Sequence, residues 1–288
     1  MLPSMPTAVA MRGDRAAPST DRLSRESVDA PLPRTPAPDH AGSMTTTPTD
    51  TLAAATTTVR IRALLVTLAL APIAFLIATT IVSVVIGVVA QGNAVLIEQQ
   101  TRDSVPHILL TTQLLLLGLV AWKLRRDHLT PSDIGWRRPS VRSLIFGIAL
   151  GAIIGIAYIT VLAPAIGLLQ SRLGDYVPAG EMFAAYASAL PLFFVANVIL
   201  APAVEESLYR GYAVPRLNAR WGAVVAIIVS SIFFGLLHWA GGAWYMLATG
   251  LVVGVPFAIL SLRAKSIVPA FGAHLVLNSI EFAWVLTS

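Results

Sequence analysis

The chain alternates between long stretches without charged residues and short polar segments. Six such stretches, the last interrupted only by Glu281, are 63–97, 104–122, 143–171, 182–204, 221–262 and 266–286. A helix needs roughly 20 mostly apolar residues to cross a bilayer. The stretch 221–262 is long enough for two helices, and Ala240-Gly241-Gly242 is a turn signal that predicts the break between them. The pattern therefore predicts an all-α fold, a polytopic membrane helical bundle of about seven transmembrane helices.

Composition supports a membrane protein and limits its chemistry. The chain is 56% hydrophobic and 12% charged, against roughly 25% charged residues in an average soluble domain. The absence of cysteine excludes disulfides, thiolate metal sites and cysteine nucleophiles. The net charge of +5 is typical of membrane proteins with basic cytoplasmic loops. We therefore expect the lipid bilayer as a partner, and no nucleic acid.

The N-terminal segment 1–59 differs from the rest of the chain. It holds 8 of the 19 prolines, no aromatic residue and no apolar period, so it cannot bury enough surface to offset its chain entropy. We predict a disordered cytoplasmic tail, part of which is absent if translation starts at Met44 rather than Met1. Segment 60–139 then supplies two transmembrane helices and a basic cytoplasmic loop, and 140–288 forms the core that carries the candidate chemistry.

The basic residues predict how the chain is oriented in the cell membrane. They gather in alternate loops, at 123–142, at 210–220 and at Arg263 and Lys265. Cytoplasmic loops are enriched in arginine and lysine. We therefore expect a multi-pass protein with a cytoplasmic N-terminus and an external C-terminus.

Small residues recur at four-residue spacing in two of the predicted helices. One helix contains Gly147, Gly151 and Gly155, and another contains Gly250 and Gly254. This spacing lets helices approach closely. We expect these faces to pack within the bundle, with dimerisation as the alternative.

Ionisable residues inside the predicted spans collect in the C-terminal half, where they indicate function. Glu205 and Glu206 end the fourth predicted helix, and Arg210 lies four residues after Glu206 on the same face. Glu205 points about 100° away from Glu206. We therefore expect Glu206 and Arg210 to form a helix-end salt bridge, while Glu205 faces a cavity.

Two further helices carry paired polar or aromatic residues at four-residue spacing. Phe234 precedes His238, and His274 precedes Asn278. A glutamate can act as the base that activates water, with a histidine holding that water. A second histidine and an asparagine can donate hydrogen bonds to a developing oxyanion. Together with Glu205, these residues predict a centre for peptide hydrolysis.

The motifs Glu205-Glu206-x-x-x-Arg210, Phe234-x-x-x-His238 and His274-x-x-x-Asn278 resemble the three signatures of the CPBP family. This family comprises the CAAX-protease and bacteriocin-processing intramembrane endopeptidases, and is also called the Abi family. The resemblance covers roughly residues 140–286. It implies an intramembrane protease core in which Glu205 and His238 activate water and His274 and Asn278 stabilise the oxyanion. Glu206, Arg210 and Phe234 would support that site.

The resemblance also implies a class of reaction and of substrate. Relatives are hydrolases of peptide bonds that remove the last three residues of prenylated proteins, or are linked in bacteria to bacteriocin processing or self-immunity. We expect a membrane-associated peptide or protein as the substrate. The family is often labelled a metalloprotease, and Glu205, His238 and His274 would be the ligands if zinc is used. We favour a mechanism with no cofactor and no metal.

Two other functions fit parts of the pattern. One is a non-enzymatic membrane protein that binds a peptide or partner, for example in immunity. The other is a proton-coupled transporter that uses Glu205, His238 and His274 as a relay. The lack of a convincing inverted repeat in the sequence counts against the transporter.

Overall fold

The computed structural model describes residues 61–91, 93, 96, 100, 103–177 and 189–287. The contacts divide the chain into a unit Met1–Thr45 and a unit Thr46–Ser288. The predicted tail, 1–59, lies outside the described residues, and everything below concerns the second unit.

Every regular element in the described part of the chain is a helix, which confirms the predicted all-α fold. The α-helices are α2 (Ile61–Val89), α4 (Val105–Arg126), α5 (Val141–Ala157), α6 (Ala163–Leu173), α8 (Leu190–Phe193), α9 (Ala201–Glu205), α10 (Val214–Leu237), α11 (Ala243–Ala248), α12 (Val255–Ala264) and α13 (Val268–Val285). Wider π-helical turns join several of them, namely η2 (Tyr158–Leu162), η4 (Phe194–Leu200), η5 (Glu206–Ala213) and η7 (Thr249–Gly254). Two 3₁₀ turns, η1 (Pro131–Ile134) and η6 (Trp239–Gly241), lie in the connections.

Six helical stretches among the described residues are long and apolar enough to cross a membrane. They are Ile61–Val89, Val105–Arg126, Val141–Leu173, Leu190–Leu237, Ala243–Ala264 and Val268–Val285. The 48-residue stretch Leu190–Leu237 contains a break at Gly222, whose φ of 82° is not helical. Its two limbs correspond to the fourth and fifth predicted helices. The predicted turn at 240–242 is also present, since α10 ends at Leu237 and α11 begins at Ala243.

One predicted boundary is wrong. α9 itself ends at Glu205, but Glu205 and Glu206 do not end the helical stretch, which begins at Leu190 and continues through η5 and past Arg210 to the break at Gly222. Glu206 and Arg210 are both buried and paired with each other. The charges neutralise one another inside the bundle, so they do not mark the point where the chain leaves it.

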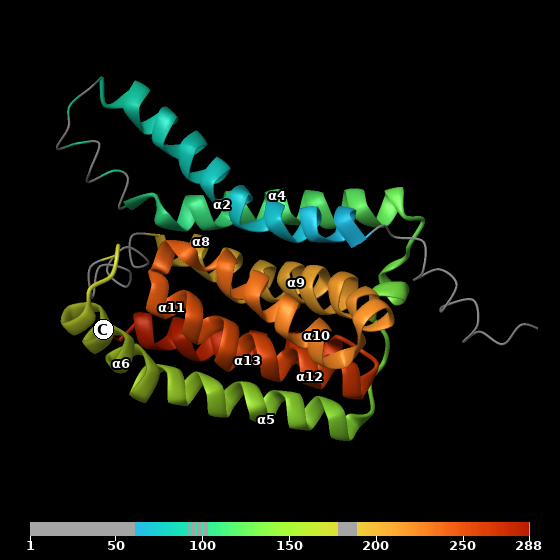
Figure 1. Cartoon of the computed structure of the whole chain (residues 1–288). Helices are drawn as coiled ribbons and strands as arrows, with labels where there is room; N and C mark the ends of the chain where they lie inside the picture. Colours follow the sequence, from blue (N-terminus) through green and yellow to red (C-terminus); the bar gives the residue numbers. More distant parts are fainter. Residues whose placement is uncertain are drawn as a thin grey trace, which may run out of the picture. The chain divides into compact units, whose positions relative to one another are not determined.

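The glycine face of α5 packs directly on α13, and these two helices lie side by side (Figure 1). A Cβ atom added at Gly147 would stand 2.3 Å from the Pro269 carbonyl oxygen, and one at Gly151 would stand 2.1 Å from the Ala273 oxygen. No side chain fits at such distances, so only glycine allows this approach. The predicted packing within the bundle is confirmed, and it fixes the backbone next to His274.

A second close contact joins η7 to α10. A Cβ atom added at Gly250 would lie 3.0 Å from the Ser231 carbonyl oxygen, and one added at Gly254 would lie 3.0 Å from the Ser231 Cβ atom. Gly235 of α10 approaches the Met246 carbonyl oxygen in the same interface. The helices that carry the predicted site residues are therefore held at short range on both sides.

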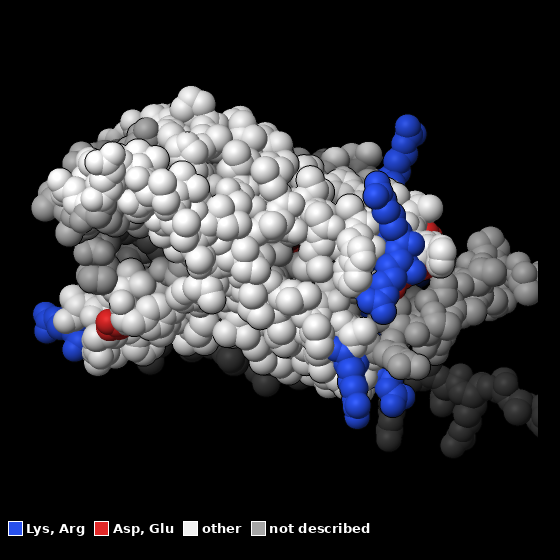
Figure 2. Space-filling model, turned by 90° about the horizontal axis from the view of Figure 1, so that it is seen from above, with Lys and Arg blue, Asp and Glu red and all other residues white. Residues whose placement is uncertain are grey.

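Apolar side chains cover much of the outer surface, as a bilayer requires. Large hydrophobic residues on α2 and α5 are exposed, among them Val84, Val88 and Ile145. On the face shown in Figure 2, arginine and lysine side chains stand toward the ends and the middle is white. The chain is a multi-pass membrane protein by these features, while its orientation stays a prediction.

Candidate active site

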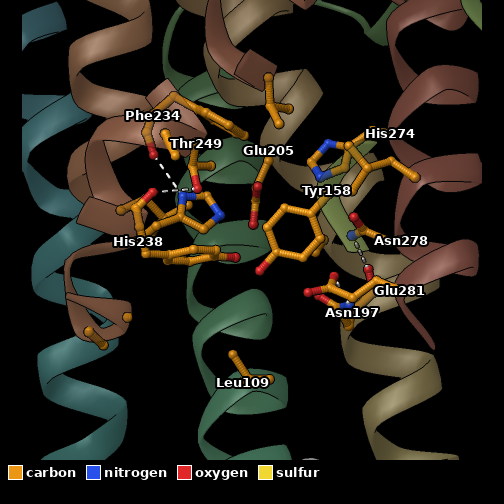
Figure 3. Close-up of a pocket in the computed structure, with 18 of the residues that line it drawn as sticks. Leu109, Tyr158, Asn197, Glu205, Phe234, His238, Thr249, His274, Asn278 and Glu281 are labelled. Carbon is orange, nitrogen blue, oxygen red and sulfur yellow. Dashed lines mark hydrogen bonds between the residues drawn. The ribbon is translucent and has the colours of Figure 1, made fainter. Parts of the chain in front are cut away.

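A cavity of about 220 Å³ lies among α4, α9, α10 and α13 (Figure 3). Five of the seven predicted site residues line it, namely Glu205, Phe234, His238, His274 and Asn278. Glu206 and Arg210 do not line the cavity and lie behind it. The structure therefore separates the two adjacent glutamates in the way their 100° offset predicts.

Glu205 presents one free carboxylate oxygen. The residue is 3% exposed, and its Oε1 accepts a hydrogen bond from Gln113 Nε2 at 2.9 Å. Its Oε2 has no hydrogen-bond partner among the described residues. In the view of Figure 3 the side chain points into the space between His238 and His274. This buried oxygen is thus a hydrogen-bond acceptor of Glu205 without a partner among the described residues.

Gln113 belongs to α4 and was not among the predicted site residues, because the candidate chemistry was expected within residues 140–288. Gln113 carries the one side-chain amide in the run from Ile108 to Val120. The other residues of that run are apolar, apart from Thr111 and Thr112. That isolated amide was the available signal. The second predicted transmembrane helix therefore contributes to the site.

Glu206 pairs with two partners rather than one. Its Oε1 lies 3.1 Å from Arg210 Nη1 and accepts a hydrogen bond from His274 Nδ1 at 2.9 Å. The Glu206 and Arg210 side chains are fully enclosed. The prediction of a Glu206–Arg210 salt bridge is confirmed, but its position at a helix end is wrong, and the link to His274 was not foreseen.

Arg210 is held from several sides. Its Nη2 donates to the Gly254 carbonyl oxygen at 3.3 Å, and its guanidinium lies 4.0 Å from the centre of the Phe234 ring. This distance is typical of a cation–π interaction. Arg210 thus connects Glu206 to η7 and to the aromatic residue of the second motif.

His238 directly follows α10, and its ring is oriented by the backbone. Its Nδ1 lies 2.8 Å from the Phe234 carbonyl oxygen, which can only accept a hydrogen bond. Nδ1 therefore carries the proton, and Nε2 is left as an acceptor. The Phe234 ring packs against both histidine rings, with centroid distances of 5.0 Å to His238 and 6.1 Å to His274.

Asn278 and Glu281 are joined through Asn197. Asn278 Nδ2 donates to the Asn197 carbonyl oxygen at 2.8 Å, and Asn197 Nδ2 lies 3.4 Å from Glu281 Oε2. All three residues line the cavity. From the sequence, Glu281 was an interruption of an apolar run and was not predicted as a site residue. Its place one turn after Asn278 on the same helix was the signal that could have linked it to the site.

Loop 174–176 is tied to the turn before α11, near the part of the cavity lined by Ala240 and Gly241. Asp175 accepts hydrogen bonds from the backbone N–H groups of Ala243 at 2.9 Å and Trp244 at 3.3 Å. Burial opposes ionisation of this carboxyl, but these backbone donors outweigh it and lower its pKa. Tyr176 also donates to the Trp239 carbonyl oxygen.

Glu205, His238 and His274, which would be the ligands if zinc is used, do not form a ready cluster of metal ligands in the structure. Within the described residues, no three histidine, aspartate or glutamate side chains are arranged to hold a metal ion. His274 directs Nδ1 to Glu206, and His238 directs Nδ1 to a backbone oxygen. Both Nε2 atoms are left free, which is also the arrangement of metal-binding histidines, so these hydrogen bonds do not decide between a zinc site and a metal-free one.

Comparisons with known proteins agree with the three motifs. A curated protein of Bacillus subtilis (strain 168), named "Putative membrane peptidase YdiL", is 35% identical over 92 residues. The match spans 32% of this chain and 36% of that relative. No solved structure matches. A family model described as "Type II CAAX prenyl endopeptidase Rce1-like" matches residues 187–280, a range that includes Glu205, His238, His274 and Asn278. The resemblance that the motifs predict is therefore confirmed for residues 187–280, which match the Rce1-like family of CAAX prenyl endopeptidases.

Proposed function

We propose that the chain is an intramembrane endopeptidase that hydrolyses a peptide bond with water activated by Glu205 and His238. One observation carries this proposal. The apolar helical stretch Leu190–Leu237, with the turn that follows it, and the stretch Val268–Val285 bring Glu205, His238, His274 and Asn278 to one buried cavity. The family match over residues 187–280 supports it, because the printed family description names an endopeptidase.

The first step is attack by water. A water molecule between Glu205 Oε2 and His238 Nε2 would meet two acceptors, because Oε2 has no other partner and Nδ1 of His238 carries the ring proton. Glu205 takes one proton as the water oxygen attacks the peptide carbonyl carbon. The hydrogen bond from Gln113 to Oε1 holds the carboxylate so that Oε2 faces the water.

The second step is collapse of the tetrahedral intermediate. Asn278 uses one N–H for the Asn197 carbonyl oxygen and has a second N–H for the oxyanion. His274 donates Nδ1–H to Glu206, so its Nε2 can hold the same oxygen only when that nitrogen carries a proton as well. Glu205 then returns its proton to the leaving nitrogen as the C–N bond breaks. The products are a carboxylic acid and an amine.

Glu206, Arg210 and Phe234 act as positioning residues in this proposal. Glu206 sets the orientation of the His274 ring. Arg210 balances the charge of Glu206 and packs on Phe234, whose ring in turn contacts both histidines. None of these three residues needs to touch the substrate.

The mechanism uses no metal, and this stays a prediction. If it holds, prolonged treatment with a chelator leaves the activity of the purified protein largely unchanged. Loss of activity that zinc restores would show that Glu205, His238 and His274 serve as metal ligands in the working enzyme.

The substrate is proposed to be a membrane-associated peptide or protein, of the CAAX type or one processed in bacteriocin maturation or self-immunity. N-terminal and C-terminal peptide profiling compares membranes that contain the wild-type protein, Glu205→Gln or Asp133→Asn. Glu205→Gln removes the base and keeps its shape, and Asp133→Asn removes a carboxylate outside the cavity. We expect new peptide ends with wild type and Asp133→Asn and none with Glu205→Gln. Equal profiles for all three would favour a non-enzymatic binding protein.

A further inference from the structure

The cavity contains a second carboxylate that the hydrolysis does not use. Glu281 follows His274 by seven residues and Asn278 by three on α13, so all three share one helix face. Seven residues of helix rise about 10 Å. Glu281 therefore lies about 10 Å along the cavity wall from the histidine next to the reacting centre.

The surroundings of Glu281 leave its charge poorly balanced. The residue is 9% exposed, and Asn197 Nδ2 contacts its Oε2 at 3.4 Å, which is long for a hydrogen bond. No lysine or arginine is among the described residues that line the cavity. The buried Arg210 is taken by Glu206 and faces away from the cavity. A buried carboxylate without a cation is unfavourable, and a cation that enters with the substrate would relieve it.

We propose that Glu281 determines substrate specificity by binding a positively charged group of the peptide. An extended peptide advances about 3.3 Å per residue, so a separation of about 10 Å corresponds to about three residues. The charged group is a lysine or arginine side chain, or a free N-terminal ammonium, within three residues of the scissile bond. The carboxylates of Glu205 and Glu281 would repel a free carboxylate in the cavity, so among the proposed substrates this inference favours a peptide cut away from its C-terminus over one of the CAAX type. This inference rests on the proposed peptidase function.

A purely structural role for Glu281 makes a different prediction. Glu281 could act through Asn197 to position Asn278, which is close to the reacting oxygen in the proposed mechanism. Loss of that positioning would lower kcat for every substrate by the same factor. A specificity role changes the ratio of kcat/KM between cationic and neutral substrates.

The experiment uses the full chain in detergent with a synthetic library of ten-residue peptides. A cleaved peptide is remade with lysine, glutamine or glutamate at each position within three residues of the cut, with a free or an acetylated N-terminus. Each version is tested with wild type, Glu281→Gln and the control Asp133→Asn, which loses a carboxylate that does not line the cavity. The acetylated and free series separate a side-chain cation from a terminal one.

For wild type and Asp133→Asn we expect kcat/KM to be about tenfold higher for one cationic version than for its glutamine version, with the glutamate version slowest. We expect Glu281→Gln to lose this preference, so that its kcat/KM values for the cationic and the glutamine versions become equal. An equal fall in kcat for all peptides would show a positioning role and overturn the inference. If Glu281→Gln does not fold, the substrate preferences of the wild-type protein alone test the inference. Turnover by wild type without any preference for a cationic peptide then overturns the inference and leaves the peptidase function standing. Absence of cleavage by wild type would overturn the proposed function, and the inference with it.

Discussion

The Glu206→Gln substitution tests how the buried charge network is balanced. In the wild-type protein the Glu206 carboxylate faces Arg210 at 3.1 Å and His274 at 2.9 Å, and all three side chains are enclosed. Glutamine preserves the shape and one acceptor oxygen, but it leaves the Arg210 charge inside the bundle without a counter-ion. Breaking a buried ion pair by removing one partner costs about 3–5 kcal/mol. Glutamine still accepts one hydrogen bond, so we expect a loss at the lower end, about 3 kcal/mol.

The assay is denaturant unfolding in detergent micelles, together with peptide turnover. Asp133→Asn, which weakens the capping box with Thr130 in the connection before α5, is the comparison variant, and we expect it to cost about 1 kcal/mol. Turnover by Glu206→Gln falls less than turnover by Glu205→Gln, because Glu206 orients His274 and does not face the water.

The double variant Glu206→Gln with Arg210→Met adds a second criterion. Both charges are then absent, so we expect much of the lost stability to return. Two outcomes would refute the reasoning. One is a loss below about 1 kcal/mol for Glu206→Gln, and the other is strict additivity in the double variant. Complete loss of turnover by a stable Glu206→Gln, with an active Glu205→Gln, would reverse the proposed roles of the two glutamates.

Four further predictions follow from other parts of the structure. Gly151→Ala places a methyl group 2.1 Å from the Ala273 carbonyl oxygen, whereas the methyl group of the matched control Gly167→Ala meets nothing within 4 Å. In thermal unfolding we expect Gly151→Ala to lose about 1–3 kcal/mol of stability, and Gly167→Ala to lose none. Gln113→Leu removes the donor to Glu205 Oε1, so kcat should fall about tenfold with a folded protein, and unchanged kcat would remove Gln113 from the site. The pKa of Asp175 is lowered in the folded state by backbone N–H donors despite partial burial. Its contribution to stability is therefore present at pH 7 and is lost only as the pH falls below the ordinary aspartate pKa. The Tm gap between wild type and Asp175→Asn should stay constant from pH 7 to about pH 5 and narrow below about pH 4. A reporter fused after Ser288 should be active only outside the cytoplasm, and activity in the cytoplasm would overturn the predicted orientation.

Much of the fold follows from patterns that act within a single helix. The uncharged runs locate the membrane spans, and the turn signal at 240–242 separates α10 from α11. The four-residue glycine spacing correctly predicts a close contact, because the face of a helix is determined by local geometry. Four-residue spacing likewise places Phe234 with His238 and His274 with Asn278.

Contacts between helices are the part that the sequence did not reveal. Gln113 and Glu205 are 92 residues apart, and Glu206 and His274 are 68 apart. No periodicity within one helix records such pairs, because they depend on how the helices cross. The same limit explains the wrong helix end at Glu206, where a buried partner allowed a charged residue to remain inside the bundle.

The contact between α5 and α13 has a consequence for the order in which the site is assembled. α13 follows the other described helices along the chain, and it docks on glycines that lie more than 110 residues earlier. His274 and Asn278 reach their partners Glu206 and Asn197 only when α13 has taken this place. During biosynthesis, a chain that has inserted α5 and α10 but not yet α13 has Glu205 and His238 without the groups proposed to hold the oxyanion. The proposed hydrolytic activity therefore requires insertion of α13. We expect partly synthesised chains to be inactive toward neighbouring proteins in the bilayer.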